Sequence, residues 1–99
     1  MSTTTIKLNV TFSGGCEILF GTRSLSIDVP SSTTLGSLVV LLKDKIVERP
    51  DQFIVNNNTT LRPGILALVN DTDGDLLGGS EYNLEDNDQV SFISTLHGG

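Results

Sequence analysis

One amphipathic helix stands alone among segments that alternate like β-strands, and this pattern most constrains how the chain can fold. Between residues 35 and 46 apolar side chains recur at i, i+3, i+4 and i+7, which predicts one buried helical face. The stripe consists of Leu35, Leu38, Val39, Leu42 and Ile46. Thr33 or Thr34 can cap the first turn. Pro50 is expected to end the helix, because Arg49 before a proline avoids helical angles.

The residues before this helix have the pattern of a β-hairpin. From residue 6 to residue 12 apolar and polar residues alternate, which places the apolar side chains on one face of a strand. The glycines at positions 14 and 15 predict a turn. A second strand is expected over residues 18–29, with a break near Gly21, and Pro30 closes it.

After the helix, the sequence predicts short strands separated by turns. Residues 51–63 are polar and rich in asparagine, so we expect a loop with one short extended piece at residues 53–55. The continuous apolar run at residues 65–69 is typical of a central strand covered on both faces. The elements expected next are a turn at 70–75, a returning strand at 76–77, a break at Gly78 and Gly79, and a last strand at 90–93.

Hairpin, helix and later strands together predict an α+β fold in which one main helix packs across a mixed sheet. This is the β-grasp, or ubiquitin-like, roll. The length of 99 residues fits one domain with a single core, and no internal repeat is visible. We therefore expect residues 1–99 to form a single domain, with residues 95–99 as a flexible C-terminal diglycine tail.

The charge balance argues against direct binding to nucleic acid. Twelve acidic residues face six basic ones, the formal net charge is -6, and the basic residues do not cluster. The longest wholly apolar runs, such as residues 38–42, have five residues and are far shorter than the roughly 20 residues that span a bilayer. The N-terminus lacks the basic start and apolar stretch of a signal peptide. We expect a monomer in the cytoplasm, with the nucleus as an additional location, and no membrane partner.

Few groups in the chain could carry catalysis of its own. His97 is the only imidazole and Cys16 the only thiol, and a packed cysteine is favoured over a Cys–His pair. Alternating carboxylates at residues 71–75 suggest a calcium loop, but its sixth and twelfth positions, Leu76 and Tyr82, lack the required Gly and Glu. A polar hairpin turn is expected there instead. No phosphate-binding loop or zinc pattern occurs, so we predict neither a bound cofactor nor a metal.

The sequence finishes with Leu96, His97, Gly98 and Gly99, which makes the terminal carboxylate the candidate reactive group. Two glycines have no Cβ, so such a tail can lie extended in a narrow channel. A carboxylate with a reference pKa of about 3.3–3.7 is anionic at neutral pH and a poor electrophile. Another protein must therefore activate it.

Several segments of the second half resemble the ubiquitin-related modifier family, whose members act as sulfur carriers and protein tags. The segments that carry the resemblance are residues 62–66, 69–71, 76–78, 81–86 and the terminal octapeptide 92–99. The Thr-Leu-His-Gly-Gly ending is a specific signature of that family. The first half is similar more loosely, because Cys16 stands at a turn position of the opening hairpin.

The resemblance implies how Gly99 would be activated. A ubiquitin-activating-like adenylyltransferase would use ATP to adenylate the Gly99 carboxylate, and its rhodanese-like sulfurtransferase domain would replace AMP with sulfur. Leu96, His97 and Gly98 would be recognised by that enzyme. The chain itself would bind no cofactor and would be a carrier and a substrate, not an enzyme.

The resemblance also implies two destinations for the resulting thiocarboxylate. A separate tRNA thiouridylase would use its sulfur for the 2-position of wobble uridine, and lysines of target proteins would form isopeptide bonds with Gly99. Two alternatives stay open at this point. One is a carrier for molybdopterin or thiamine biosynthesis, and the other is a ubiquitin-like domain that binds partners noncovalently, with an incidental diglycine.

Overall fold

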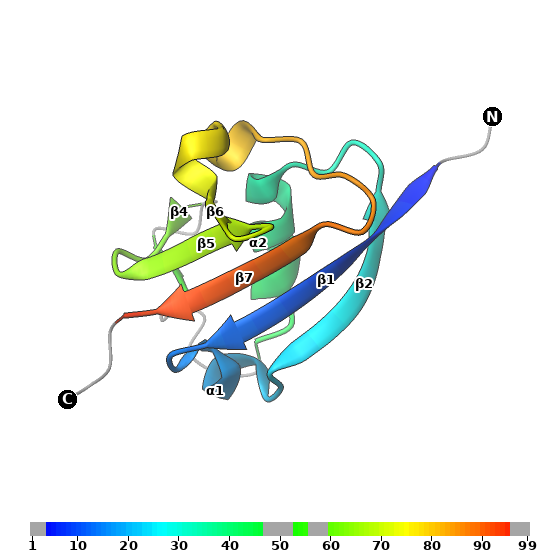
Figure 1. Cartoon of the computed structure of the whole chain (residues 1–99). Helices are drawn as coiled ribbons and strands as arrows, with labels where there is room; N and C mark the ends of the chain where they lie inside the picture. Colours follow the sequence, from blue (N-terminus) through cyan, green and yellow to red (C-terminus); the bar gives the residue numbers. More distant parts are fainter. Residues whose placement is uncertain (1–3, 47–52, 56–59, 96–99) are drawn as a thin grey trace.

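In the computed structural model, a mixed sheet of five strands lies across one main helix (Figure 1). The structure describes residues 4–46, 53–55 and 60–95. Its elements in chain order are β1 (Thr5–Ser13), α1 (Cys16–Phe20), β2 (Ser24–Pro30), α2 (Leu35–Lys43), β3 (Ile54–Val55), β4 (Thr60–Leu61), β5 (Ile65–Val69), β6 (Thr72–Asp73), the 3-10 turns η2 (Gly74–Leu77) and η3 (Gly79–Glu81), and β7 (Gln89–Ser94). The predicted α+β class is confirmed.

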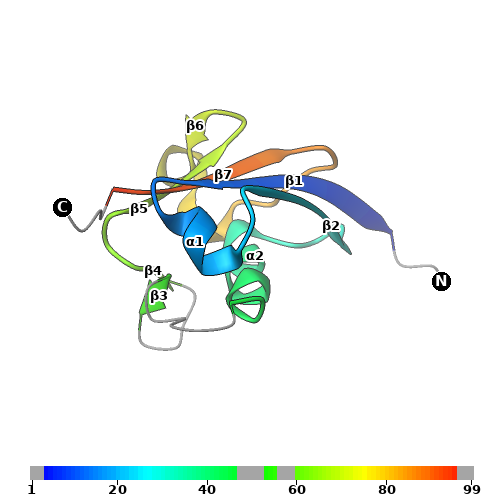
Figure 2. The same cartoon turned by 90° about the horizontal axis from the view of Figure 1, so that it is seen from below.

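The sheet has the order β2-β1-β7-β5-β6. β1 pairs with β2 in antiparallel and with β7 in parallel orientation, while β5 pairs antiparallel with both β7 and β6. Parallel neighbours need a long crossover connection, and the chain between β1 and β7 supplies α2 as part of it. Figure 2 shows α2 and the small β3–β4 ladder on the same side of the sheet.

The core lies between this face of the sheet and α2. All five residues of the predicted helical stripe are buried, and so are the four alternating apolar residues of β1. The β1 set is Ile6, Leu8, Val10 and Phe12. Four phenylalanines also meet here, with ring centroids 4.1 Å apart for Phe12 and Phe20 and 5.4 Å apart for Phe53 and Phe92. Within the described ranges, no helix is long and apolar enough to cross a membrane.

The main helix begins as predicted and ends earlier than predicted. Thr34 is the N-cap, and its Oγ1 accepts a hydrogen bond of 3.1 Å from the Ser37 N–H. The last helical residue is Lys43, whereas we expected the helix to run to Pro50, which lies outside the described residues. Tighter i to i+3 bonds close the end, because Ile46 N donates to the Lys43 carbonyl at 3.1 Å. This tightening still brings Ile46 into the core.

The expected second strand over residues 18–29 is wrong in its first part. Residues Cys16–Phe20 form the short helix α1, and the strand begins only at Ser24. Glycines in the left-handed region flank α1, Gly15 with φ 119° and Gly21 with φ 71°. Residues 16 and 20 would lie on the same side in a helical turn and also in an extended strand, so the apolar pattern does not distinguish the two. The left-handed conformations of Gly15 and Gly21 are what favour the helix.

Three further predictions after the helix need correction. β5 is not a central strand covered on both faces, because its burial alternates and only the two-residue β6 lies outside it. Leu76 and Leu77 belong to the 3-10 turn η2 and not to a returning strand, since Asp73 accepts a bond from Asp75 N (2.9 Å) and starts that turn. The polar 51–63 region contains two short strands, β3 and β4, that pair with each other.

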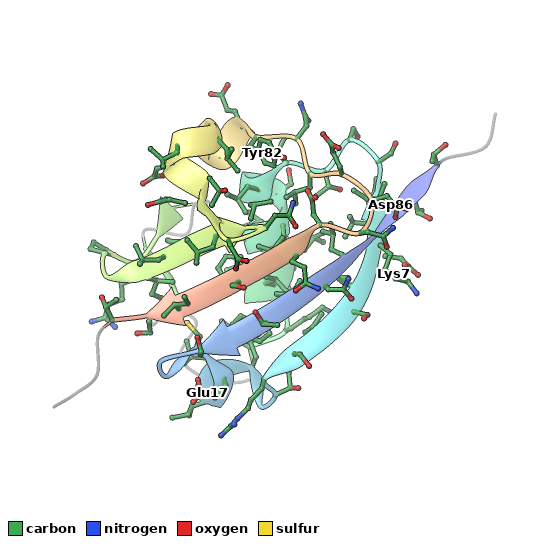
Figure 3. All side chains as sticks on the ribbon, viewed as in Figure 1. Lys7, Glu17, Tyr82 and Asp86 are labelled. Carbon is green, nitrogen blue, oxygen red and sulfur yellow. The ribbon has the colours of Figure 1, made fainter. Side chains whose placement is uncertain are left out.

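Buried polar bonds fix the loop that leads into β7. Asp88 is only 6% exposed, and its carboxylate accepts hydrogen bonds from the Asn70 side-chain amide (2.9 Å) and from the Glu85 backbone N–H (2.8 Å). Nearby, the Lys7 backbone N–H donates to Asp86 Oδ1 at 2.8 Å, where Figure 3 shows the two residues side by side. These bonds join β1, the turn after β5 and the start of β7. They therefore help to fix where β7 begins relative to β1 and β5.

Truncation of Leu38 tests the helix–sheet core. Leu38 is fully buried, and we expect Leu38→Ala to lower the free energy of unfolding by about 2–5 kcal/mol because it removes buried methyl groups and leaves a cavity. Leu41→Ala is the matched control on the same helix, since Leu41 is 41% exposed. Urea denaturation measures both. Equal losses for the two variants would contradict the packing described.

Candidate functional site at the end of β7

The residues predicted to carry the function lie just beyond the part of the chain that the structure describes. These are Leu96, His97, Gly98 and Gly99. The last described residue is Thr95, which is exposed and follows directly on β7. The site is therefore defined here by the surface from which that segment continues.

Thr95 is tied to the neighbouring strand by two hydrogen bonds. Its backbone N–H and its Oγ1 both donate to the Gly64 carbonyl oxygen, at 2.7 Å and 2.6 Å. Gly64 directly precedes β5 and has φ 99°, a conformation that favours glycine. The ladder between β5 and β7 is thus extended by one residue past Ser94, and Thr95 is the anchored base of the terminal segment.

On the other side of β7, Gly14 holds the same end of the sheet. It has φ 69°, and a Cβ built on it would collide with the carbonyl oxygen of Ser94. A side chain cannot fit without moving β7. The predicted turn at positions 14 and 15 is confirmed, and its first glycine has a second role as the close neighbour of β7. α1 with Glu17 lies at this end too (Figure 3).

The outer face of the sheet, away from α2, carries apolar side chains next to this end. Leu66 of β5 pairs with Ile93 of β7, and Leu68 pairs with Ser91. We name Leu66, Leu68 and Ile93 the outer patch. Leu66 is 43% exposed and the other two are partly exposed. Farther along this face the pairs are polar, for example Thr11 with Ser91, whose hydroxyls are 2.8 Å apart.

Charge is distributed unevenly along the sequence. Arg62 is the last of the six basic residues, whereas seven of the twelve acidic residues follow it. All seven lie between Asp71 and Asp88, in the β5–β6 turn, β6, η2, η3 and the loop before β7, so this part of the fold carries negative charge without a basic residue. An electrostatic field of this sign favours encounter with a partner that has a basic surface.

Cys16 is buried in the core at the start of α1. Burial, with a smaller contribution from the charge of Glu17, raises the pKa of its thiol to about 11. The thiolate that nucleophilic chemistry needs is therefore scarce at neutral pH. The packed cysteine that we favoured from the sequence is what the structure shows. The distance to His97 is not described, since that residue lies past Thr95.

Carboxylates near the acidic turn have local structural tasks. Asn70 and Asp71 both have positive φ, 52° and 69°, and form the two-residue turn between β5 and β6. A polar hairpin turn is present as predicted, but it is shorter than the expected 70–75, because β6 occupies Thr72–Asp73 and η2 begins at Gly74. Asp73 caps η2. Among the described residues, no group of three or more His, Cys, Asp or Glu side chains could hold a metal ion.

The predicted site residues were those of the terminal segment, and the sequence reasoning missed the surface around its base. Neither the Thr95–Gly64 anchor nor the outer patch was foreseen. A partial signal existed for the patch, because Leu66 and Leu68 alternate with buried residues in β5. The pairing of Leu66 with Ile93 depends on the strand register, which the sequence does not display.

The fold and the terminal Gly98-Gly99 sequence define a ubiquitin-like protein of the β-grasp class. The family model for Urm1, the ubiquitin related modifier, matches residues 7–99. The chain is 48% identical over 100 residues to ubiquitin-related modifier 1 of Schizosaccharomyces pombe, covering 95% of this chain and all of that protein. It is 47% identical over 97 residues to the homolog of Drosophila willistoni, covering 95% and 96%.

A solved structure agrees with this assignment. The solution structure of Urm1 from Trypanosoma brucei has 50% sequence identity and a TM-score of 0.82, with complete coverage of both chains. The chain therefore belongs to the Urm1 family of ubiquitin-related modifiers, a ubiquitin-like sulfur-carrier family. The predicted β-grasp fold is confirmed by the same comparison.

Gly14→Ala tests the contact at the end of β7. Both Gly14 and Gly21 have positive φ near 70°, but only at Gly14 would a Cβ meet a backbone atom within 4 Å. We expect Gly21→Ala to cost about 1 kcal/mol of unfolding free energy for its backbone conformation alone, and Gly14→Ala to cost at least twice as much. Urea denaturation gives these values, and NMR amide shifts at Ser94 and Thr95 should move only in Gly14→Ala.

Cys16 should be protected from alkylation. With its pKa at about 11 instead of 9.0, the native thiol should react with iodoacetamide at pH 8 on the order of 100-fold more slowly than the urea-unfolded chain. The unfolded thiol ionises from about pH 9 upward while the folded thiol stays protonated to about pH 11. Unfolding free energy should therefore fall between these pH values, and Cys16→Ala should lose this component. Rapid native labelling would contradict the buried assignment.

Proposed function

We propose that this chain is a sulfur carrier whose Gly99 carboxylate is converted to a thiocarboxylate by a separate activating enzyme. The observation that carries the proposal is the family match, which extends through residue 99 and so includes the diglycine. The fold adds support. Thr95, from which the terminal segment continues, is anchored to Gly64 at the end of the sheet, and the outer patch beside it offers an apolar surface for an enzyme.

The chemistry requires three steps, of which the second takes place at the acyl carbon of Gly99. An oxygen of the Gly99 carboxylate attacks the α-phosphorus of ATP, pyrophosphate leaves, and the product is an acyl-adenylate. A persulfide of the activating enzyme then attacks the acyl carbon and expels AMP. A second thiol breaks the resulting sulfur–sulfur bond and releases the thiocarboxylate. Orientation and charge neutralisation in the first two steps belong to the enzyme, an adenylyltransferase with a rhodanese domain.

The proposal extends to two outcomes for the thiocarboxylate. One is sulfur transfer, through a tRNA thiouridylase, to the 2-position of wobble uridine. The acidic charge of residues 63–95 supports delivery through a protein and not by direct contact with RNA, because phosphate binding needs clustered cations. The other is an isopeptide bond between Gly99 and lysines of target proteins. Leu96, His97 and Gly98 are proposed as the residues that the activating enzyme recognises.

Intact mass spectrometry tests the carrier step. The protein is incubated with ATP, a persulfide donor and an activating enzyme of this family, and we expect a sulfur-for-oxygen mass increase localised to the Gly99 peptide. Deletion of Gly98 and Gly99 removes the reacting group and should abolish the increase. A variant with one added C-terminal residue serves as the matched control, since it keeps both glycines but shifts the carboxylate.

The outcomes separate the proposal from its alternative. An unmodified carboxylate in an enzyme preparation that thiocarboxylates another family member would reject the carrier function. Unchanged activity of the deletion or the extension in tRNA thiolation would reject Gly99 as the active group and indicate a domain that acts only through noncovalent binding.

A further inference from the structure

An open cavity of about 340 Å³ lies at the outer edge of β5, and Leu66 is the one residue of the outer patch that also lines it. One wall is the first half of α2, a second is the chain just before β5, and a third is formed by η2 and η3. The lining residues that matter for its chemistry are Leu35, Val39, Leu61, Ala67, Asp75 and Ser80. We name this cavity the β5-edge groove. Its volume is at the small end of ligand sites.

The floor of the groove is a strand edge that is only partly paired. β6 pairs with Leu68 and Val69 alone, so among the described residues no strand pairs with Ile65 to Ala67 on the side away from β7. Such an edge can accept a further strand. The strand could not extend beyond Ala67, because η2 begins there and a Cβ on Gly74 would lie 3.1 Å from the Ala67 carbonyl oxygen.

The hydrogen-bonding pattern shows which backbone groups face the groove. Val69 pairs with Thr72 across the two-residue turn, so the N–H and C=O of alternate residues of β5 point the same way, those of Ile65 and Ala67 included. The four groups on this side are the N–H and the C=O of Ile65 and of Ala67, and two of them are already hydrogen-bonded or blocked. The Ile65 N–H donates to the Arg62 carbonyl at 3.0 Å, and the Ala67 carbonyl lies against Gly74. The Ile65 carbonyl and the Ala67 N–H are the groups that face the groove and can pair.

The Ile65 carbonyl and the Ala67 N–H can both pair with a single residue of an added parallel strand. An antiparallel strand would reach the same two groups only with two residues that lie two positions apart, so N-methylation of one central residue distinguishes the two directions. In parallel pairing, one residue of the added strand donates to the carbonyl of residue i and accepts from the N–H of residue i+2. Ile65 and Ala67 have this spacing. The side chains on either side of that central residue then point toward α2, where Leu35 and Val39 are apolar.

Charge at the rim selects the flanking residues of the peptide. Asp73 and Asp75 line the groove, with Arg62 as the basic residue among the lining side chains. Asp73 is used as the cap of η2, whereas Asp75 is exposed. With no Lys or Arg after Arg62 in the sequence, the surroundings on this side are acidic. A lysine or arginine of the bound peptide, next to its apolar residues, would complement the charge of these carboxylates.

We propose that the β5-edge groove binds an extended segment of a partner protein, parallel to β5, with apolar side chains against Leu35 and Val39 and a basic residue near Asp75. The segment forms two backbone hydrogen bonds, one to the Ile65 carbonyl and one from the Ala67 N–H. This binding uses no atom of the terminal segment. It is therefore independent of the carrier function, and the deletion of Gly98 and Gly99 should leave it unchanged.

The test uses the full chain and three capped peptides. The first is acetyl-Lys-Leu-Val-Leu-Lys-amide, the second has the same sequence with its central valine N-methylated, and the third replaces both lysines by glutamate. Two-dimensional amide NMR follows each titration. With the first peptide, we expect the shifts to concentrate on β5, the first turn of α2 and η2. N-methylation removes one hydrogen bond and should weaken binding about threefold to tenfold. Charge reversal should weaken it roughly fivefold.

A pair of variants provides the matched control. Asp75→Lys reverses the charge at the groove, and Asp28→Lys makes the same change at exposed Asp28 on the opposite edge strand β2. We expect only Asp75→Lys to weaken the lysine peptide and to favour the glutamate peptide. Shifts confined to β2 or to the outer patch, equal affinity for the N-methylated peptide, or no shifts at millimolar peptide would each overturn the proposal.

Discussion

The parallel pairing of β1 with β7 is the contact on which the rest of the structure depends. It joins residues about eighty positions apart, with Val10 beside Val90 and Phe12 beside Phe92. Because parallel neighbours cannot be joined by a tight turn, everything between them must cross the sheet and return. The main helix covers one face during that crossing. The second half of the chain then supplies β5 on the far side of β7, and the end of β7 falls beside the hairpin turn that began the fold.

Much of this arrangement follows from local sequence pattern. The α2 stripe and the alternation in β1 predict their buried residues correctly, since a helix or strand with one apolar face has one way to turn it inward. The predictions from sequence are wrong where the conformation depends on the backbone angles or the cap of a single residue. Left-handed glycines at 15 and 21 convert an expected strand into α1. The side-chain cap of Asp73 turns two leucines that look like a strand into η2.

The candidate site divides in the same way. Its terminal residues are recognisable because they are consecutive, and the family match includes them. The surface at their base is assembled from three strands. Which of its residues lie next to one another depends on the strand register, so the sequence alone does not predict it. The anchor between Thr95 and Gly64 joins residues 31 positions apart. The β5-edge groove is further removed from sequence pattern, because it results from β6 being shorter than β5.

The anchor of Thr95 also acts as a ruler. Four residues separate this fixed point from the terminal carboxylate, and an extended chain of that length reaches about 14 Å. An active site that modifies Gly99 must therefore approach the folded domain to within that distance. For the proposed function, a channel that holds these four residues cannot be longer than this. An enzyme that uses the carboxylate must then lie close to the end of the sheet, and selection among partners can occur on this surface as well as on the tail.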